Sequence, residues 1–293
     1  GLGAGDTSGV IALNSQLVAG GVSIDGTAED GGDGVNLYYV DIGAGLGDVI
    51  IDGQSLDGDG LYAYSSNIVT AGGDISLTGI GGAQGVDFDG DSNQVYSYGG
   101  DILVRGDGGT GVGVYFSGQV NSDGGDITMY GLSAAAIGLD FGGGYYSGMV
   151  SDGGDIVLTG IGVTGGVQLQ DSAFGAGNVI DSAGGAITVA GNASAPDGIG
   201  VYPSGVDLIG GAGDVTLTGV APLGIGILLA NGASISTTTG AISLYGTGAD
   251  FGLDITDGAL DTDSGDITLE GTATAATAIA GVRVTGDGLT TNG

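Results

Sequence analysis

Short stretches in which apolar and polar residues alternate recur along the whole chain. The clearest copies lie at residues 72–79 (GGDISLTG), 99–106 (GGDILVRG) and 124–131 (GGDITMYG). Alternation with a period of two residues is typical of a β-strand with one buried face. The Asp of one copy follows the Asp of the previous copy by 25 to 31 residues, so the chain is a tandem repeat with a period of roughly 27 residues.

Two further alternating segments follow within each period. The second comes after a glycine-rich loop, as at 34–37 (GVNL), 85–88 (GVDF) and 224–227 (GIGI), and the third leads into the next Gly-Gly pair, as at 67–70 (NIVT), 94–97 (QVYS) and 119–122 (QVNS). Glycine-rich turns between such segments predict three short strands per period. One period cannot bury its apolar faces alone, but stacked periods can, because each strand pairs with its equivalent in the next coil.

The repeat therefore predicts an all-β fold: a right-handed parallel β-helix of about ten coils of roughly 27 residues, with three short strands each. The right hand follows from the general preference of parallel crossover connections. Apolar positions such as Ile75 and Leu77 are expected to form inward columns along this solenoid. The glycine that closes the first strand, Gly79 in this copy, is expected at a corner, where φ is positive or a Cβ has no room.

The repeats run through residues 1–293, which we interpret as a single β-helical solenoid segment. Solenoids need caps that cover the open core and the unpaired strand edges, and neither end of the sequence shows one. We therefore expect the chain to be a window of a longer repeat array. The alternative is a protomer that stacks end to end with identical chains.

The repeat also suggests a family. Tandem Gly-Asp-Ile-Thr-Leu-Thr-Gly-like strands followed by Gly-Val-x-Leu strands resemble the repeat regions of filamentous-haemagglutinin-like exoproteins, which are large, repetitive bacterial surface adhesins. The resemblance covers nearly the whole chain and is one of repeat grammar. It implies a right-handed β-helical shaft, export to the extracellular space or the bacterial cell surface, and a role in adhesion or fibre building.

Composition narrows the function further. The chain holds 34 acidic and two basic residues, a net charge of −32, and no His, Cys or Trp. Without a cationic surface, binding to nucleic acid is excluded, and no apolar run is long enough to predict membrane insertion. The usual metal ligands, thiol nucleophiles and neutral-pH general bases are missing, so we expect no enzyme.

Acidic residues recur at two kinds of position. An Asp precedes most of the first strands, with Ala186 and Ala241 as interruptions; the Asp positions are 48, 74, 101, 126, 155, 214 and 266. We favour the interpretation that each carboxylate accepts hydrogen bonds from turn amides, and the alternative is cation binding along this edge. Denser acidic loops are candidate calcium sites because flexible loops of oxygen ligands suit Ca²⁺; they contain Asp87, Asp89 and Asp91; Asp57 and Asp59; and Asp257, Asp261 and Asp263.

The spacing of these loops does not match an EF-hand, so a solvated acidic surface is the alternative, and no cofactor is required other than the candidate Ca²⁺. The twelve Tyr, including Tyr38, Tyr39, Tyr62 and Tyr64, indicate either surface packing or an aromatic patch for cell-surface glycans or a neighbouring fibre. The sequence thus predicts a non-catalytic structural shaft of an extracellular bacterial adhesin or surface fibre. A self-assembling filament subunit and a carbohydrate-binding or carbohydrate-cleaving β-helix are the alternatives.

Overall fold

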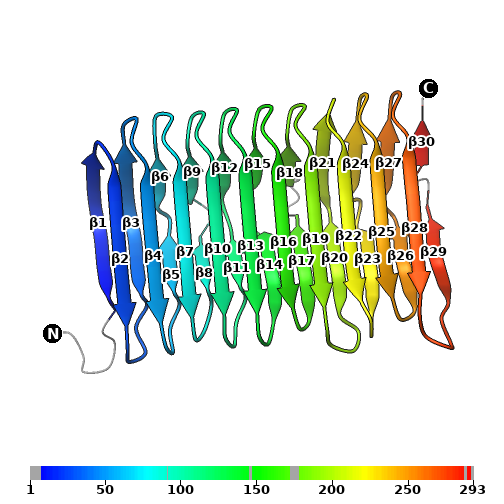
Figure 1. Cartoon of the computed structure of the whole chain (residues 1–293), viewed down its shortest axis with the longest axis horizontal. Coiled ribbons are helices and arrows are strands. Elements are labelled where there is room, and N and C mark those ends of the chain that lie inside the picture. Colours follow the sequence, from blue (N-terminus) through cyan, green and yellow to red (C-terminus); the bar gives the residue numbers. More distant parts are fainter. Residues whose placement is uncertain (1–7, 91, 145–146, 172–177, 287–288, 292–293) are drawn as a thin grey trace.

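The chain folds as a β-solenoid whose coils stack along one long axis (Figure 1). The structure, a computed structural model, describes residues 8–90, 92–144, 147–171, 178–286 and 289–291. All strand pairs in it are parallel, and each strand pairs with its equivalent in the neighbouring coils. The prediction of an all-β parallel solenoid of about ten coils with three short strands each is confirmed. Its right-handed winding stays a prediction.

The first strand of every coil belongs to one ten-stranded sheet, here called the front sheet. Nine of its ten members begin one residue after the recurrent Asp or Ala. They are β2 (Val22–Ala28), β4 (Val49–Ser55), β7 (Ile75–Gly81), β10 (Ile102–Gly108), β13 (Ile127–Ser133), β16 (Ile156–Gly162), β19 (Ile187–Ala193), β22 (Val215–Ala221), β25 (Ile242–Gly248) and β28 (Ile267–Ala273).

The second and third strands of the coils form a twenty-stranded sheet, here called the back sheet. In the first two coils one bent strand supplies both: β1 (Val10–Ala19) and β3 (Val35–Ala44). The separate second strands are β5 (Leu61–Tyr64), β8 (Val86–Asp89), β11 (Val114–Phe116), β14 (Ile137–Gly142), β17 (Gly165–Gln170), β20 (Ile199–Ser204), β23 (Ile225–Ala230), β26 (Phe251–Thr256) and β29 (Ala280–Thr285). The third strands are β6 (Asn67–Val69), β9 (Gln94–Tyr96), β12 (Gln119–Asn121), β15 (Gly148–Val150), β18 (Asn178–Asp181), β21 (Val206–Gly211), β24 (Ser234–Thr237), β27 (Ala259–Thr262) and β30 (Leu289–Thr291).

The core lies between the two sheets and runs through the coils without a break. The predicted inward columns are buried: Ile102 and Val104 on β10 and their equivalents on the neighbouring strands expose 1% of their surface or less. Phe88, Phe116 and Phe141 form an aromatic column on the back-sheet side, with ring centroids 4.7 and 5.9 Å apart. Each coil thus buries its apolar face against the coils before and after it.

The prediction that the glycine closing each first strand lies at a corner is wrong. Gly131 is the fifth of seven residues of β13, and its φ is not positive. A Cβ built on it would lie 2.0 Å from the carbonyl oxygen of Gly138 on the facing strand β14. The second half of the expectation, that a Cβ has no room, therefore holds. Paired glycines thus bring the backbones of the two sheets into contact at this position of the coil, as Gly79 with Gly85 and Gly106 with Gly113 also do.

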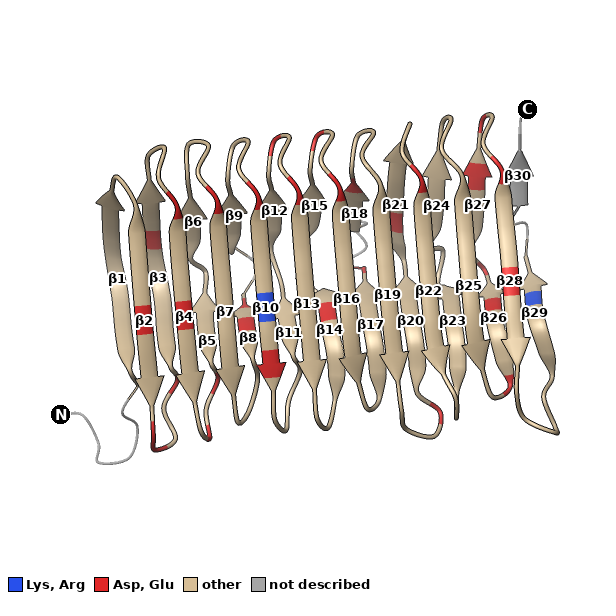
Figure 2. Ribbon diagram, in the orientation of Figure 1, with Lys and Arg blue, Asp and Glu red and all other residues tan. Residues whose placement is uncertain are grey.

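The corners are made by other residues. Between β12 and β13, Asp123 and Gly124 have φ values of 53° and 112°, and between the second and third strands Tyr39 and Gly90 have φ values of 53° and 92°. These turns bring the carboxylates to the rims of the solenoid, as Figure 2 shows for the loops that link the strands.

Candidate functional site

The Asp residues that precede the first strands form a hydrogen-bond ladder. In six of them the carboxylate Oδ1 accepts the backbone N–H of the equivalent residue one coil on, at 2.7 to 2.9 Å; the six are Asp48, Asp74, Asp101, Asp126, Asp155 and Asp214. Ala186 and Ala241 fit this column because they only donate their N–H groups, to Asp155 and Asp214. The interpretation favoured from the sequence, a carboxylate that accepts from turn amides, is confirmed at these positions.

A column of buried hydroxyl groups runs beside this ladder, and the sequence analysis missed it. Each hydroxyl donates to the carbonyl oxygen three residues later, as Ser122 does to Gly125 at 2.5 Å; the others are Thr70, Ser97, Ser151, Ser182 and Thr237. All six side chains are buried. A buried hydroxyl is costly without a partner, so a Ser or Thr three residues before the second glycine was the available signal.

The residues predicted to bind calcium differ in their exposure and in their neighbours in the structure. Asp57, Asp257, Asp261 and Asp263 are exposed. Asp91 lies outside the described residues. Within the described ranges, no group of three or more His, Cys, Asp or Glu residues has a geometry that holds a metal ion. Calcium binding therefore stays a prediction, without a formed site in this part of the chain.

The structure does bring Asp59, Asp87 and Asp89 together, and it adds Asp33, which the sequence analysis did not single out. Asp33 Oδ1 accepts the backbone N–H of Asp59 at 3.1 Å, and Asp59 Oδ1 accepts that of Gln84 at 2.9 Å. The Gln84 side-chain amide donates to Asp87 Oδ2 at 2.6 Å. The four carboxylates form an acidic cluster, with Asp33 and Asp59 in the loops that lead into β3 and β5 and Asp87 and Asp89 on β8 itself.

Asp87 is the buried member of this acidic cluster. It exposes 6% of its surface, and its Oδ1 is buried without a hydrogen-bond partner. Burial, and to a smaller extent the negative charges of Asp59, Asp89 and Asp33, together raise the pKa of Asp87 to about 8. The carboxyl group is therefore mostly protonated at neutral pH, and a protonated carboxyl is a poor ligand for a cation.

Two more buried carboxyl groups face outward from the back sheet. The pKa of Asp140 is raised to about 6, because burial raises it by more than the Gln170 side-chain amide, which donates to Asp140 at 2.9 and 3.2 Å, lowers it. Asp254 instead forms an ion pair with Arg283, and the guanidinium also lies over the ring of Phe251, 4.0 Å from its centroid. The only basic residue of the last coils thus neutralises a buried carboxylate.

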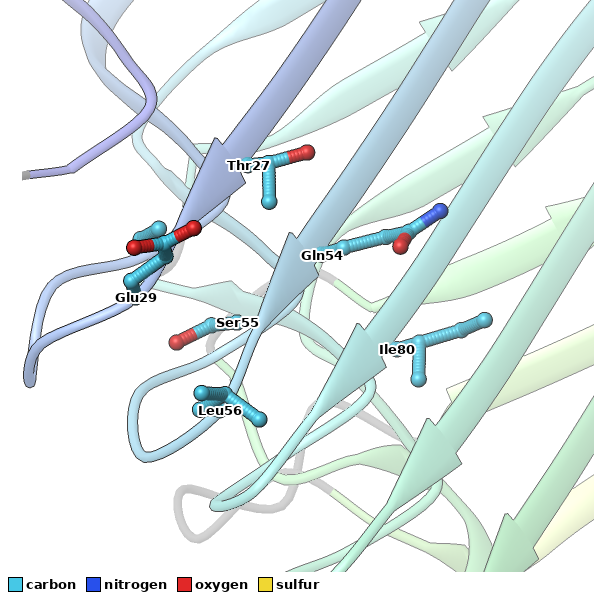
Figure 3. A pocket seen from close by; sticks show the side chains of 7 residues that line it. Thr27, Glu29, Gln54, Ser55, Leu56 and Ile80 are labelled. Atoms are coloured by element: carbon cyan, nitrogen blue, oxygen red, sulfur yellow. The ribbon is translucent and has the colours of Figure 1, made fainter.

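The pocket of Figure 3 lies where β2, β4 and β7 end, and its volume is about 290 Å³. Its lining residues are Thr27, Ala28, Glu29, Gln54, Ser55, Leu56 and Ile80. The Ser55 hydroxyl is held by the carbonyl of Gly32 at 2.6 Å and by the N–H of Gly58 at 2.8 Å. Glycoside hydrolysis uses two carboxyl groups, and this lining supplies one, from Glu29.

An aromatic cluster stands on the back sheet near its first coils. Tyr38 stacks on Tyr64 with ring centroids 5.0 Å apart, and Tyr39 meets both rings edge-on at 4.7 and 5.5 Å. Tyr38 and Tyr39 expose 38% and 47% of their surface. Tyr39 has a φ of 53°, which is a strained backbone conformation for a bulky residue. The turn therefore places this ring at the surface at a cost in conformational energy.

Comparisons with known proteins leave the function to be argued from this geometry. No family model matches the chain, and no curated protein or solved structure matches it either. In the described residues no helix is long and apolar enough to cross a membrane.

Proposed function

We propose that this chain is a segment of the structural shaft of an extracellular bacterial adhesin or cell-surface fibre, and that it is not catalytic. The observation that carries the proposal is the unbroken pairing of all ten strands of the front sheet. Nine steps of about 4.8 Å make a rod about 43 Å long, and each further coil of the same kind lengthens it by one step. A repeat of this kind is suited to building a long, stiff rod rather than to enclosing a substrate.

The ladders beside the core favour the same function. The Asp residues before the first strands and the buried hydroxyls that precede them tie each coil to the next at the corner. Both columns recur along most of the solenoid, so the same set of hydrogen bonds joins most pairs of neighbouring coils. The resemblance of the repeat to filamentous-haemagglutinin-like exoproteins supports an exported, adhesive setting, in which salt screens the charge of −32.

The mass of the native polypeptide tests this proposal. An antibody raised against the chain should detect, on a denaturing gel of the source cells, a polypeptide far larger than 27.8 kDa, and it should label the surface of intact cells. A band near 27.8 kDa, or labelling that requires permeabilised cells, contradicts the shaft.

A self-assembling filament subunit is the second candidate, favoured by apolar side chains on the outermost strands. Ile11, Leu13 and Val18 on β1 expose 48%, 57% and 70% of their surface, and Val282 and Val284 on β29 each expose 38%. Stacking of one chain on the next would cover these residues and pair the strand edges. Electron microscopy of the purified chain tests this: filaments with the coil repeat along their axis support the subunit, and isolated rods contradict it.

Carbohydrate binding is the third candidate, and the cluster of Tyr38, Tyr39 and Tyr64 favours it. Exposed tyrosine rings present an apolar face together with a hydroxyl, which suits neutral sugars. Titration with a neutral oligosaccharide such as chitohexaose should show binding that Tyr39→Ala weakens and Tyr98→Ala leaves unchanged. Equal binding by both variants, or none by the wild type, contradicts this site.

A further inference from the structure

The front sheet has a wide area without charged side chains. The outward positions of β13, β16, β19, β22 and β25 carry Thr, Ser, Ala, Val, Ile, Leu, Tyr and Asn, and these five strands contain no Asp, Glu, Lys or Arg. In Figure 2 the ribbons of these five strands are tan along their whole length, whereas β10 and β28 on either side carry coloured residues. We call the outward side chains of these five strands the uncharged face.

Strand propensity alone does not explain the uncharged face. Asp is generally depleted in strands, yet the back sheet of the same molecule carries Asp on β3, β8, β14, β18, β21, β26 and β27. Both sheets have the same parallel pairing and the same coil period. The absence of charge from five consecutive front strands is therefore a property of that surface and not of β-structure in this chain.

The uncharged face is also partly apolar and shallowly grooved. Ile161 and Tyr245 expose 38% and 37% of their surface there. A groove of about 230 Å³ runs across its centre, lined by Thr159, Ile161, Ala190, Asn192, Thr218 and Val220, with Gly160 and Gly191. Side chains of intermediate size on either side of a small residue, Ala190, give this surface relief into which a second β-surface can pack.

We propose that the uncharged face is where two copies of this chain associate, front sheet against front sheet. The charge of −32 makes most approaches of one copy to another repulsive, because carboxylates line the rims and the back sheet. The uncharged face itself carries no charged side chain; the nearest carboxylates, Asp126, Asp155 and Asp214, lie at its edge, one residue before β13, β16 and β22. For side-by-side association, charge thus favours this surface over the rims and the back sheet.

The size of the uncharged face sets the strength of this pairing. Five strands about 4.8 Å apart and seven residues of about 3.3 Å each cover about 550 Å² per copy, or about 1,100 Å² for the pair. Specific interfaces begin near about 1,000 Å² in total, so the pair lies at the lower limit of size and is expected to be weak. The pairing goes beyond the proposed shaft function and does not depend on it, since it concerns only the isolated chain.

Sedimentation equilibrium of the full chain tests the proposal with two matched variants. Asn192→Asp adds one carboxylate at the centre of the uncharged face, and Asn121→Asp adds the same charge to the back sheet. Both replacements keep the side-chain shape, and Asp at 121 retains the oxygen that accepts the N–H of Asp123 at 2.8 Å. The change in net charge is the same in both variants, so a difference between their dimer dissociation constants reports only the position of the added charge.

We expect the wild type to form dimers more tightly in about 0.5 M NaCl than in about 0.05 M, because salt screens the repulsion between the two copies. Asn192→Asp should weaken the dimer about tenfold or more, since each dimer then holds two unpaired carboxylates in its interface. Thr218→Asp, on the adjacent strand, should do the same, and Asn121→Asp should match the wild type. A wild type that stays monomeric in both salts overturns the proposal, and so does association that Asn192→Asp and Asn121→Asp affect equally, as end-to-end stacking would give.

Discussion

Replacing Asp87 by Asn should stabilise the protein at neutral pH. In the folded state this carboxyl group keeps its proton up to a pKa of about 8, whereas its ordinary value is 3.8. An Asn side chain has the shape of the protonated carboxyl, and its oxygen can still accept the hydrogen bond from Gln84. The variant therefore removes the titration while it preserves the packing.

The magnitude follows from proton linkage. A group whose pKa is raised by folding leaves stability intact below its unfolded pKa, and stability is lost as the pH rises towards the folded pKa. Between pH 3.8 and about 8 the wild type should lose about 1.4 kcal/mol per pH unit through Asp87, or about 4 kcal/mol by pH 7. Because the residue exposes only 6% of its surface, solvent screening reduces this value little.

Urea unfolding followed by circular dichroism between pH 3.5 and 9 measures the effect, since urea leaves the ionic strength unchanged. The difference in free energy of unfolding between Asp87→Asn and wild type should be near zero at pH 3.5, rise through neutral pH and level off above pH 8. Asp25→Asn, which removes an exposed carboxylate from β2, is the control for the loss of one negative charge. A difference that stays flat from pH 4 to pH 8, or that Asp25→Asn reproduces, refutes the reasoning.

Four further predictions concern other parts of the structure. Asp140→Asn should act in the same direction by about 3 kcal/mol, and its effect should level off near pH 6 in the same urea series, because the pKa of Asp140 is raised only to about 6. Gly131→Ala should lower the urea midpoint strongly or prevent folding, since its Cβ would lie 2.0 Å from a backbone oxygen, whereas Gly45→Ala, with open space around its Cβ, should be neutral. Ser122→Ala should cost about 1 to 3 kcal/mol in the same assay, because the buried carbonyl of Gly125 loses a donor. Addition of Ca²⁺ after chelation should raise the melting temperature; a rise no larger than that given by NaCl of equal ionic strength would show screening and no calcium site.

The architecture was predictable because, in a solenoid, residues at equivalent positions of successive sequence periods are also neighbours in space. The alternation in residues 99–106 places Ile102 and Val104 inward, and the same alternation one period later places their neighbours beside them. The error at Gly131 has a physical origin: a glycine after an alternating segment is usually a turn, but here it marks a close approach of two backbones. Sequence pattern alone does not separate these two reasons for lacking a Cβ.

The acidic cluster could be predicted only in part, because its members are neighbours across coils and not along the chain. The sequence grouped Asp87 with Asp89 and Asp91, which follow within four residues, whereas the fold places it near Asp59 and Asp33 from the two preceding coils. Aligning these residues from sequence requires the loop lengths to match, and successive periods vary from 25 to 31 residues. Contacts between loops of successive coils therefore cannot be read from the sequence pattern, whereas contacts between the regular strands can.

The burial of Asp87 depends in the same way on residues of adjacent coils. Its partners in the parallel register are Tyr62 on β5 and Tyr115 on β11, so two large rings occupy the positions on either side of a short side chain. An outward strand position is ordinarily solvated, but between two tyrosines a carboxylate loses much of its water. The pKa of an acid on this surface is therefore set by the side chains one coil before and one coil after it, and exchanging the acid between coils would change its protonation without any change in its own loop.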